Sequence, residues 1–157
     1  MTTNEIIGCV TMIVAVIGLL FSCYQWWKKV QLERAERLSN LITLLRNDVR
    51  QLRILYKIDY GESWYDENFH KSELEGELDR FLSFYEYILY LRMNCIISEK
   101  EFRFFEYDIM RIVKNSDLRS YLFNLYQFCR DNKLTFPYQN VVVYGMQKGH
   151  IKQSFFE

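Results

Sequence analysis

The residue types best suited to hold a ligand gather in the segment after Pro137, where no acidic residue occurs before the terminal Glu157. Lysine side chains bind phosphate oxygens, tyrosine rings stack on nucleobases, and glycines leave backbone N–H groups open to an anion. The pattern therefore predicts an anion-binding site. Its candidate ligand-binding residues are Tyr138, Asn140, Tyr144, Lys148, His150 and Lys152, with Gly145 and Gly149 between them. An exposed terminal segment, or a strand that closes the domain, is the alternative interpretation.

Patterns that carry catalysis or bind metal ions are absent from the sequence. It has no His-Glu-x-x-His, no glycine-rich phosphate loop and no nucleophile elbow. Its two histidines, His70 and His150, lie in segments of opposite charge, and an acid–base pair built from them would need an unusual assembly. The acidic residues between Asp66 and Asp79 do not follow the order of a calcium-binding loop. We therefore expect a protein without catalytic residues, metal ions or cofactors.

The net charge of zero conceals three blocks of different sign. Residues 28–57 hold eight basic and three acidic residues, residues 58–108 hold five and thirteen, and residues 109–157 hold seven and three. The ends of the soluble part are therefore basic and its middle is acidic. Solvated helix faces explain such blocks without any partner, whereas contact with an anionic ligand is the functional interpretation of the basic ones.

The segment Ile6 to Trp27 contains 22 residues without a formal charge. As a helix it spans about 33 Å, which is enough to cross a hydrocarbon core of about 30 Å. Tyr24 and the tryptophans supply an interfacial aromatic belt, and Lys28 and Lys29 follow directly. We expect a single-pass protein of the cell inner membrane, with its N-terminus outside and its C-terminal domain in the cytoplasm. A cleaved signal peptide is the alternative interpretation of this segment. However, the first residues carry no positive side chain, and no small-residue cleavage pattern follows the apolar run.

Small residues recur at steps of three and four within this segment, at Gly8, Thr11, Ala15, Gly18 and Ser22. A stripe of small residues lets two membrane helices approach closely, and its period suits left-handed pairing. This pattern predicts a homo-oligomer, with a tetramer among the options. Small residues are also common in membrane helices that do not associate.

No glycine or proline occurs between Gly18 and Gly61, so we expect a long helix through residues 28–57. Apolar or small residues form a heptad-like stripe in it: Ala35, Leu38, Ile42, Leu45, Val49, Leu52 and Tyr56. The stripe fits two arrangements equally well. Either it forms an oligomeric stalk, or it packs onto the protein's own domain.

Residues 58–157 are expected to form a small helical bundle, which makes the fold mainly all-α. After a loop at residues 61–70, the pairs Ser72 with Glu75 and Ser98 with Glu101 predict capping boxes, and Ser116 predicts a third helix start. The β-branched and aromatic run at residues 141–144 predicts a short C-terminal strand. The expected divisions are a transmembrane anchor (1–27), a juxtamembrane stalk (28–57) and a cytosolic helical domain (58–157).

One segment carries a resemblance, LDRFLSFYEYILYLRMNCIISEKEFRFFEYDIMRIV, which covers residues 78–113. It resembles a family of small bacterial single-pass proteins of uncharacterised function, through an apolar-aromatic helix with the step Phe84-Tyr85-Glu86, an isoleucine-rich turn and a second helix. The resemblance brings no known active site with it.

The layout of the chain is also similar to that of the small membrane effectors of type III CRISPR systems, in which a membrane segment precedes a cytosolic domain that binds a cyclic oligoadenylate. That resemblance implies a non-enzymatic effector of antiviral defence. Its partners would be the lipid bilayer, copies of itself, and a cyclic oligoadenylate or another anionic nucleotide, without duplex nucleic acid. A membrane-tethered adaptor or scaffold that binds a protein partner is the alternative.

Overall fold

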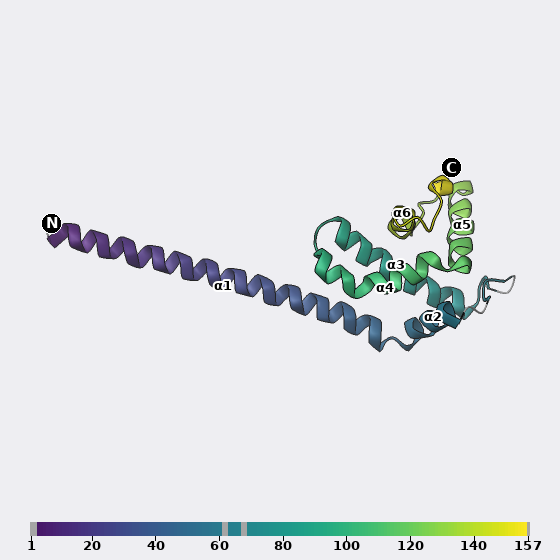
Figure 1. Ribbon diagram of the computed structural model, residues 1–157, viewed down its shortest axis with the longest axis horizontal. Helices are drawn as coiled ribbons and strands as arrows, with labels where there is room; N and C mark the ends of the chain where they lie inside the picture. Colours follow the sequence, from purple (N-terminus) through teal and green to yellow (C-terminus); the bar gives the residue numbers. More distant parts are fainter. Residues whose placement is uncertain (1–2, 61–62, 67–68, 157) are drawn as a thin grey trace. The chain divides into compact units, whose positions relative to one another are not determined.

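The computed structural model describes residues 3–60, 63–66 and 69–156, apart from the side chains of residues 4–6, 9 and 10 (Figure 1). This part of the chain holds helices α1 to α6 and a short 3-10 turn and contains no strand, which confirms the mainly all-α fold. The chain divides into two units, one up to Leu44 and one from Leu45 onward.

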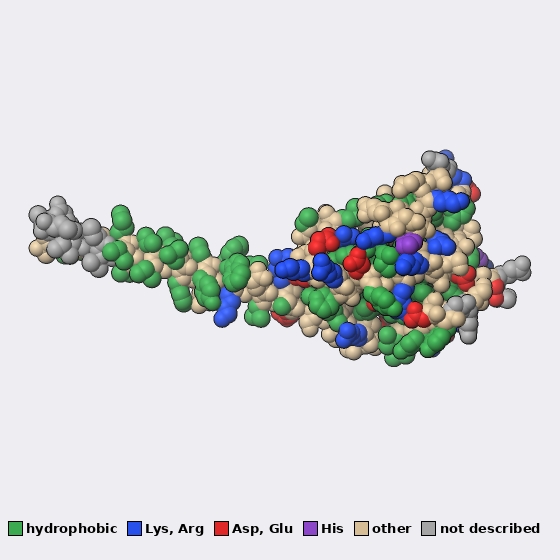
Figure 2. All heavy atoms as spheres, viewed as in Figure 1, with side chains coloured by type: hydrophobic (Ala, Val, Ile, Leu, Met, Phe, Trp, Pro, Cys, Tyr) green, Lys and Arg blue, Asp and Glu red, His purple; other side chains and the backbone are tan. Residues whose placement is uncertain are grey.

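Helix α1 (Thr3–Asn47) continues without interruption from the apolar segment into the charged one. It is long and apolar enough to cross a membrane, and hydrophobic side chains cover its described apolar part (Figure 2). The hydroxyls of Thr11 and Ser22 donate to the carbonyls of Ile7 and Gly18, each at 2.9 Å. Such bonds satisfy hydroxyl groups that would find no partner in lipid.

The two apolar stripes of α1 lie on opposite sides of this helix. Gly18 belongs to the small-residue stripe and Leu38 to the heptad-like one. Twenty residues at about 100° each place these two positions about 160° apart around the helix axis. One straight helix therefore cannot present both stripes to a single neighbour.

Asp48 separates α1 from α2 (Val49–Tyr60). Its Oδ1 accepts the backbone amide of Arg50 at 3.0 Å, which is how an aspartate begins a new helix. The sequence predicts one helix through residues 28–57, and the break at Asp48 corrects that prediction. The break could not be expected from helix-breaking residues, because no glycine or proline lies near it.

Helix α2 belongs to the second unit, where it contacts α3 and α4. Its buried residues are Gln51, Ile54, Leu55 and Ile58. The heptad-like stripe occupies a different face of α2, because Val49 and Tyr56 are exposed by 72% and 57%. Of the two arrangements expected for residues 28–57, packing onto the domain holds for α2, but through other residues than the stripe.

The loop after α2 is partly internal. Trp64 and Phe69 are buried, and the Trp64 amide donates to Asp117 Oδ2 at 3.0 Å. Of the loop predicted at residues 61–70, positions 61, 62, 67 and 68 lie outside the described residues.

Helices α3 (Glu73–Met93) and α4 (Glu99–Lys114) pack against each other. The predicted capping box at Ser98 is confirmed, with both reciprocal bonds to Glu101 present. At the start of α3 only half of the expected box forms. Ser72 accepts the Glu75 amide, whereas the Glu75 carboxylate accepts the Lys71 amide at 2.6 Å instead of the Ser72 amide.

Helix α5 (Ser116–Asp131) begins one residue earlier than predicted. Its cap is Asn115 and not Ser116, because Asn115 Oδ1 accepts the Leu118 amide at 2.9 Å. Asn115 also ends α4, so no linker separates the two helices. The buried faces of α4 and α5 consist of Phe102, Phe105, Ile109, Ile112, Val113, Leu118, Tyr121, Leu122 and Cys129.

The C-terminal segment is helical where a strand was expected. Helix α6 (Gln139–Gln147) includes residues 141–144 and packs on α3 and α4, and a 3-10 turn (Gln153–Phe156) follows. The strand prediction is wrong because a carboxylate from α3 caps the α6 amides, as described below. Burial of Val141 and Val142 on one side of α6 then outweighs their β-propensity.

Candidate functional site

Tyr138, the first predicted binding residue, lies inside the fold. Only 4% of its surface is exposed, and its hydroxyl donates to Asp79 Oδ1 at 2.9 Å. The Tyr121 hydroxyl donates to the same oxygen at 2.6 Å. Burial raises the pKa of both tyrosines well above the ordinary value, so both stay protonated donors. The Tyr138 ring is not exposed for stacking on a base.

Asn140 contributes its backbone to the start of α6. Its amide and that of Val141 donate to Glu86 Oε1 and Oε2 at 2.9 and 3.0 Å. Glu86 comes from α3, so a residue far away in the sequence satisfies two of the free amides at this helix end. Burial raises the pKa of Glu86. These hydrogen bonds act in the opposite direction, but the effect of burial is larger.

Tyr144 and Lys148 share one carboxylate. The Tyr144 hydroxyl and the Lys148 ammonium donate to Glu106 Oε1 at 3.0 and 3.1 Å. The bonds from Lys148 and Tyr144 lower the pKa of Glu106, and the bond to Glu106 raises the pKa of Lys148. Tyr144 is only 2% exposed. This pair is therefore engaged within the domain, where it joins α6 to α4.

Both glycines of the predicted site have structural reasons to be glycine. A Cβ on Gly145 would lie 2.5 Å from Cδ1 of Ile151 and 3.3 Å from Cγ1 of Val113, so only glycine allows this close packing. Gly149 follows α6 with a φ of +74°, which a side chain disfavours. This turn carries the chain back over α6 and places the next residues beside α5.

His150 and Lys152 meet Arg119 of α5 at a hollow of about 440 Å³. Its lining residues are Arg119, Phe123, Gly149, His150, Ile151, Lys152, Ser154 and Phe155. The Arg119 guanidinium is held at the end of α4, because Nη1 donates to the Lys114 carbonyl at 2.8 Å. Within the described chain neither His150 nor Lys152 has an ion-pair partner. Two of the six predicted residues therefore line this hollow, whereas Tyr144 and Lys148 meet at Glu106 and the remaining two lie elsewhere.

This basic hollow suits an anionic group flanked by an apolar one. None of its lining residues is acidic, while Phe123 and Phe155 supply ring surface beside the cationic groups. Its volume is within the range of small-molecule sites, about 300–1,000 Å³. Arg119 and Phe123 were not predicted, although their four-residue spacing places them on one face of a helix. No family model, curated protein or solved structure matches the chain.

Proposed function

We propose that this protein is a single-pass effector of the inner membrane that acts by binding rather than catalysis, and that its cytoplasmic domain binds an anionic messenger of the cyclic-oligonucleotide type. The observation that supports the proposal is the convergence of Arg119, His150 and Lys152 on one acid-free hollow. A guanidinium, an imidazole and an ammonium together provide charge-assisted donors for phosphate oxygens. As in the type III CRISPR effectors that the layout resembles, the response would serve antiviral defence.

The Arg119 guanidinium is held in one position, which favours specific binding over nonspecific attraction of anions. Arg119 is already oriented by the carbonyls of Lys114 and Val113, at 2.8 and 3.4 Å, so binding need not restrict a freely moving side chain. Lys152 is exposed and supplies the adjustable contact. The rings of Phe123 and Phe155, which meet edge to face at 5.6 Å, offer apolar surface for a base or sugar.

A messenger with several equivalent phosphates suits a self-associating protein. Each copy offers one basic hollow, and closed oligomers have rotational symmetry. A cyclic oligonucleotide repeats its phosphate at the same symmetry, so several copies would bind one ring. The small-residue stripe of α1, with Gly18 at its middle, would hold these copies together in the membrane.

The proposal is tested by nucleotide binding to the full-length protein in detergent micelles, measured by calorimetry. We expect cyclic and linear oligoadenylates to bind and uncharged adenosine to fail. Lys152→Ala and His150→Ala should each weaken binding about tenfold, since a hydrogen bond to a charged group contributes about 1.5–3 kcal/mol. Lys100→Ala is the matched control, because Lys100 is exposed at the opposite end of α4 from Lys114. Equal binding by all three variants would place the ligand elsewhere.

The adaptor alternative has its own support in the outer face of α2. Val49, Tyr56 and Tyr60 are exposed there, and they line an apolar hollow of about 350 Å³. A helix that offers aromatic anchors at such spacing can dock a protein segment. This function predicts that Tyr56→Ala abolishes capture of a protein partner while nucleotides bind neither form.

A further inference from the structure

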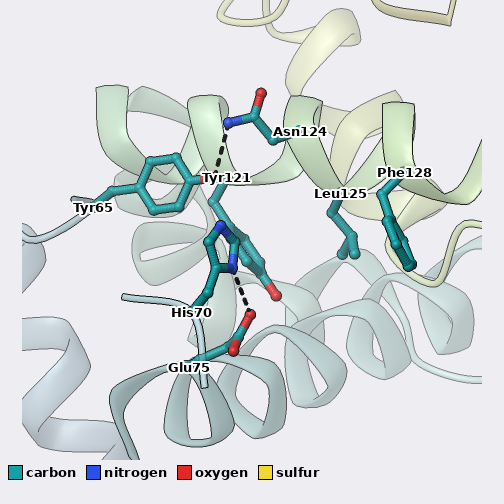
Figure 3. A pocket seen from close by; sticks show the side chains of 7 residues that line it. All are labelled: Tyr65, His70, Glu75, Tyr121, Asn124, Leu125 and Phe128. Atoms are coloured by element: carbon teal, nitrogen blue, oxygen red, sulfur yellow. Dashed lines mark hydrogen bonds and ion pairs between the residues drawn. The ribbon is translucent and has the colours of Figure 1, made fainter. Parts of the chain in front are cut away.

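A third cavity, of about 340 Å³, lies between α5 and the segment that leads into α3 (Figure 3). Its lining residues are Tyr65, His70, Glu75, Tyr121, Asn124, Leu125 and Phe128. None of the residues proposed to hold the anionic messenger contributes to it. We call this cavity the aromatic pocket.

Helix α5 presents one face to the aromatic pocket and another to the basic hollow. Tyr121, Leu125 and Phe128 follow one another at steps of four and three and therefore share a face. Arg119 and Phe123 of the basic hollow lie about 170° away around the helix, at about 100° per residue. The two cavities thus flank the same helix on opposite sides.

The Tyr65 ring meets two other rings edge to face in the aromatic pocket. The planes of Tyr65 and Tyr121 are inclined by 83°, and those of Tyr65 and His70 by 81°, with centroids 5.9 Å apart in both pairs. The Asn124 amide fixes the Tyr65 ring by donating to its hydroxyl at 2.8 Å, and Phe128 reaches out from α5 beyond Leu125 (Figure 3).

His70 lies beside a carboxylate that lines the aromatic pocket. Its Nδ1 is 3.1 Å from Glu75 Oε1, and the Lys71 amide donates to Glu75 Oε2 at 2.6 Å. These two contacts hold the Glu75 carboxylate in place among the lining residues.

The negative charge around the aromatic pocket is not neutralised by lysine or arginine. Besides His70, Glu75 accepts a backbone amide, Asp79 accepts the Tyr121 hydroxyl at 2.6 Å, and Asp117 accepts the Trp64 amide. Within the described chain, none of these three carboxylates forms an ion pair with a lysine or arginine. Neutral donors orient these carboxylates but leave their charge in place, and Glu75 is the one of the three that lines the pocket, where it can meet a cation.

We propose that the aromatic pocket binds a small organic cation that carries an alkylammonium group. The faces of Tyr65 and Phe128 attract such a group through their ring quadrupoles, and the Glu75 carboxylate that lines the pocket adds electrostatic attraction. A primary ammonium would also donate to the Glu75 carboxylate. This site is independent of the anionic messenger, because the two cavities lie on opposite faces of α5.

Choline and its uncharged isostere 3,3-dimethyl-1-butanol form a matched pair of probes. They are titrated into the full-length protein in maltoside micelles, which contain no choline lipid, at constant ionic strength. The readout is tryptophan fluorescence in a Trp26→Phe/Trp27→Phe background, where Trp64 is the one remaining tryptophan. Trp64 lies 5.4 Å from Phe69, which in turn contacts Tyr121 at 5.5 Å, so occupancy of the aromatic pocket changes its surroundings.

We expect choline to bind with a dissociation constant near 1 mM, and the isostere at least about tenfold more weakly. Phe128→Ala and Tyr65→Leu should each weaken choline binding severalfold. Phe104→Ala, which removes an exposed ring from α4, should leave it unchanged. Equal binding of choline and the isostere, no saturation by about 30 mM choline, or wild-type affinity in both pocket variants would overturn the proposal.

Discussion

Glu86 of α3 holds the first turn of α6 by accepting the Asn140 amide at 2.9 Å. Through its other oxygen it also accepts the Val141 amide, so one side chain caps a helix that begins more than fifty residues later. No hydroxyl or amide side chain caps this helix locally, because its N-cap residue is Tyr138. The start of α6, and with it the position of the basic hollow, depends on this contact.

Removal of that cap should destabilise the domain. Glu86→Ala is expected to lower the free energy of unfolding by about 1–2 kcal/mol, the usual effect of losing an N-cap. Glu86→Gln, which keeps one acceptor, should cost less. Thermal melting followed by circular dichroism measures both, with Glu36→Ala of α1 as the control. A melting temperature unchanged in Glu86→Ala would contradict the capping role.

The carboxylate shared by Tyr144 and Lys148 should make stability depend on pH. The pKa of Glu106 is lowered from its ordinary 4.5, so its stabilising contribution is complete above 4.5 and is lost as the pH falls through the lowered value. The melting temperature of Glu106→Gln should therefore approach that of the wild type on acidification. A difference between the two proteins that persists or widens in acid would show that the charge is not the cause.

The close contact between α6 and the turn after it predicts a rescue experiment. Gly145→Ala places a Cβ 2.5 Å from Ile151 Cδ1 and 2.8 Å from its Cγ1, and such overpacking typically costs about 1–3 kcal/mol. Ile151→Ala removes both Cδ1 and Cγ1, so the double variant should be more stable than the sum of the two single effects predicts. Strict additivity of the two single effects would mean that the contact is not the source of the loss.

Self-association through the small-residue stripe can be tested within the membrane. Gly18→Leu together with Ala15→Leu should weaken association in a membrane two-hybrid assay, because bulk at these positions separates the helix backbones. Val14→Leu with Ile17→Leu changes other positions of the same helix and is the control. If only the control pair abolishes association, the stripe is not the interface.

The helices could be predicted from local signals, whereas the site depends on contacts between distant residues. Capping serines and apolar periodicity located α3 and α4 because these signals operate within a turn or two. Residues 141–144 misled the prediction, since their β-propensity is local and the cap from Glu86 is not. Likewise, α6 ends at Gln147 and the chain turns at Gly149, so Tyr144 and His150 lie on different surfaces although they are close in the sequence. The turn at Gly149 is what brings His150 and Lys152 to Arg119 of α5.

The opposed stripes of α1 limit what one straight neighbour can cover. Two helices that meet along Gly18 turn the sides that carry Leu38 outward, away from each other. At about 1.5 Å per residue, these two positions also lie about 30 Å apart along the helix axis. A self-associating pair would therefore use one stripe and leave the other for a different neighbour, so the apolar segment and the charged segment after it would select their contacts separately.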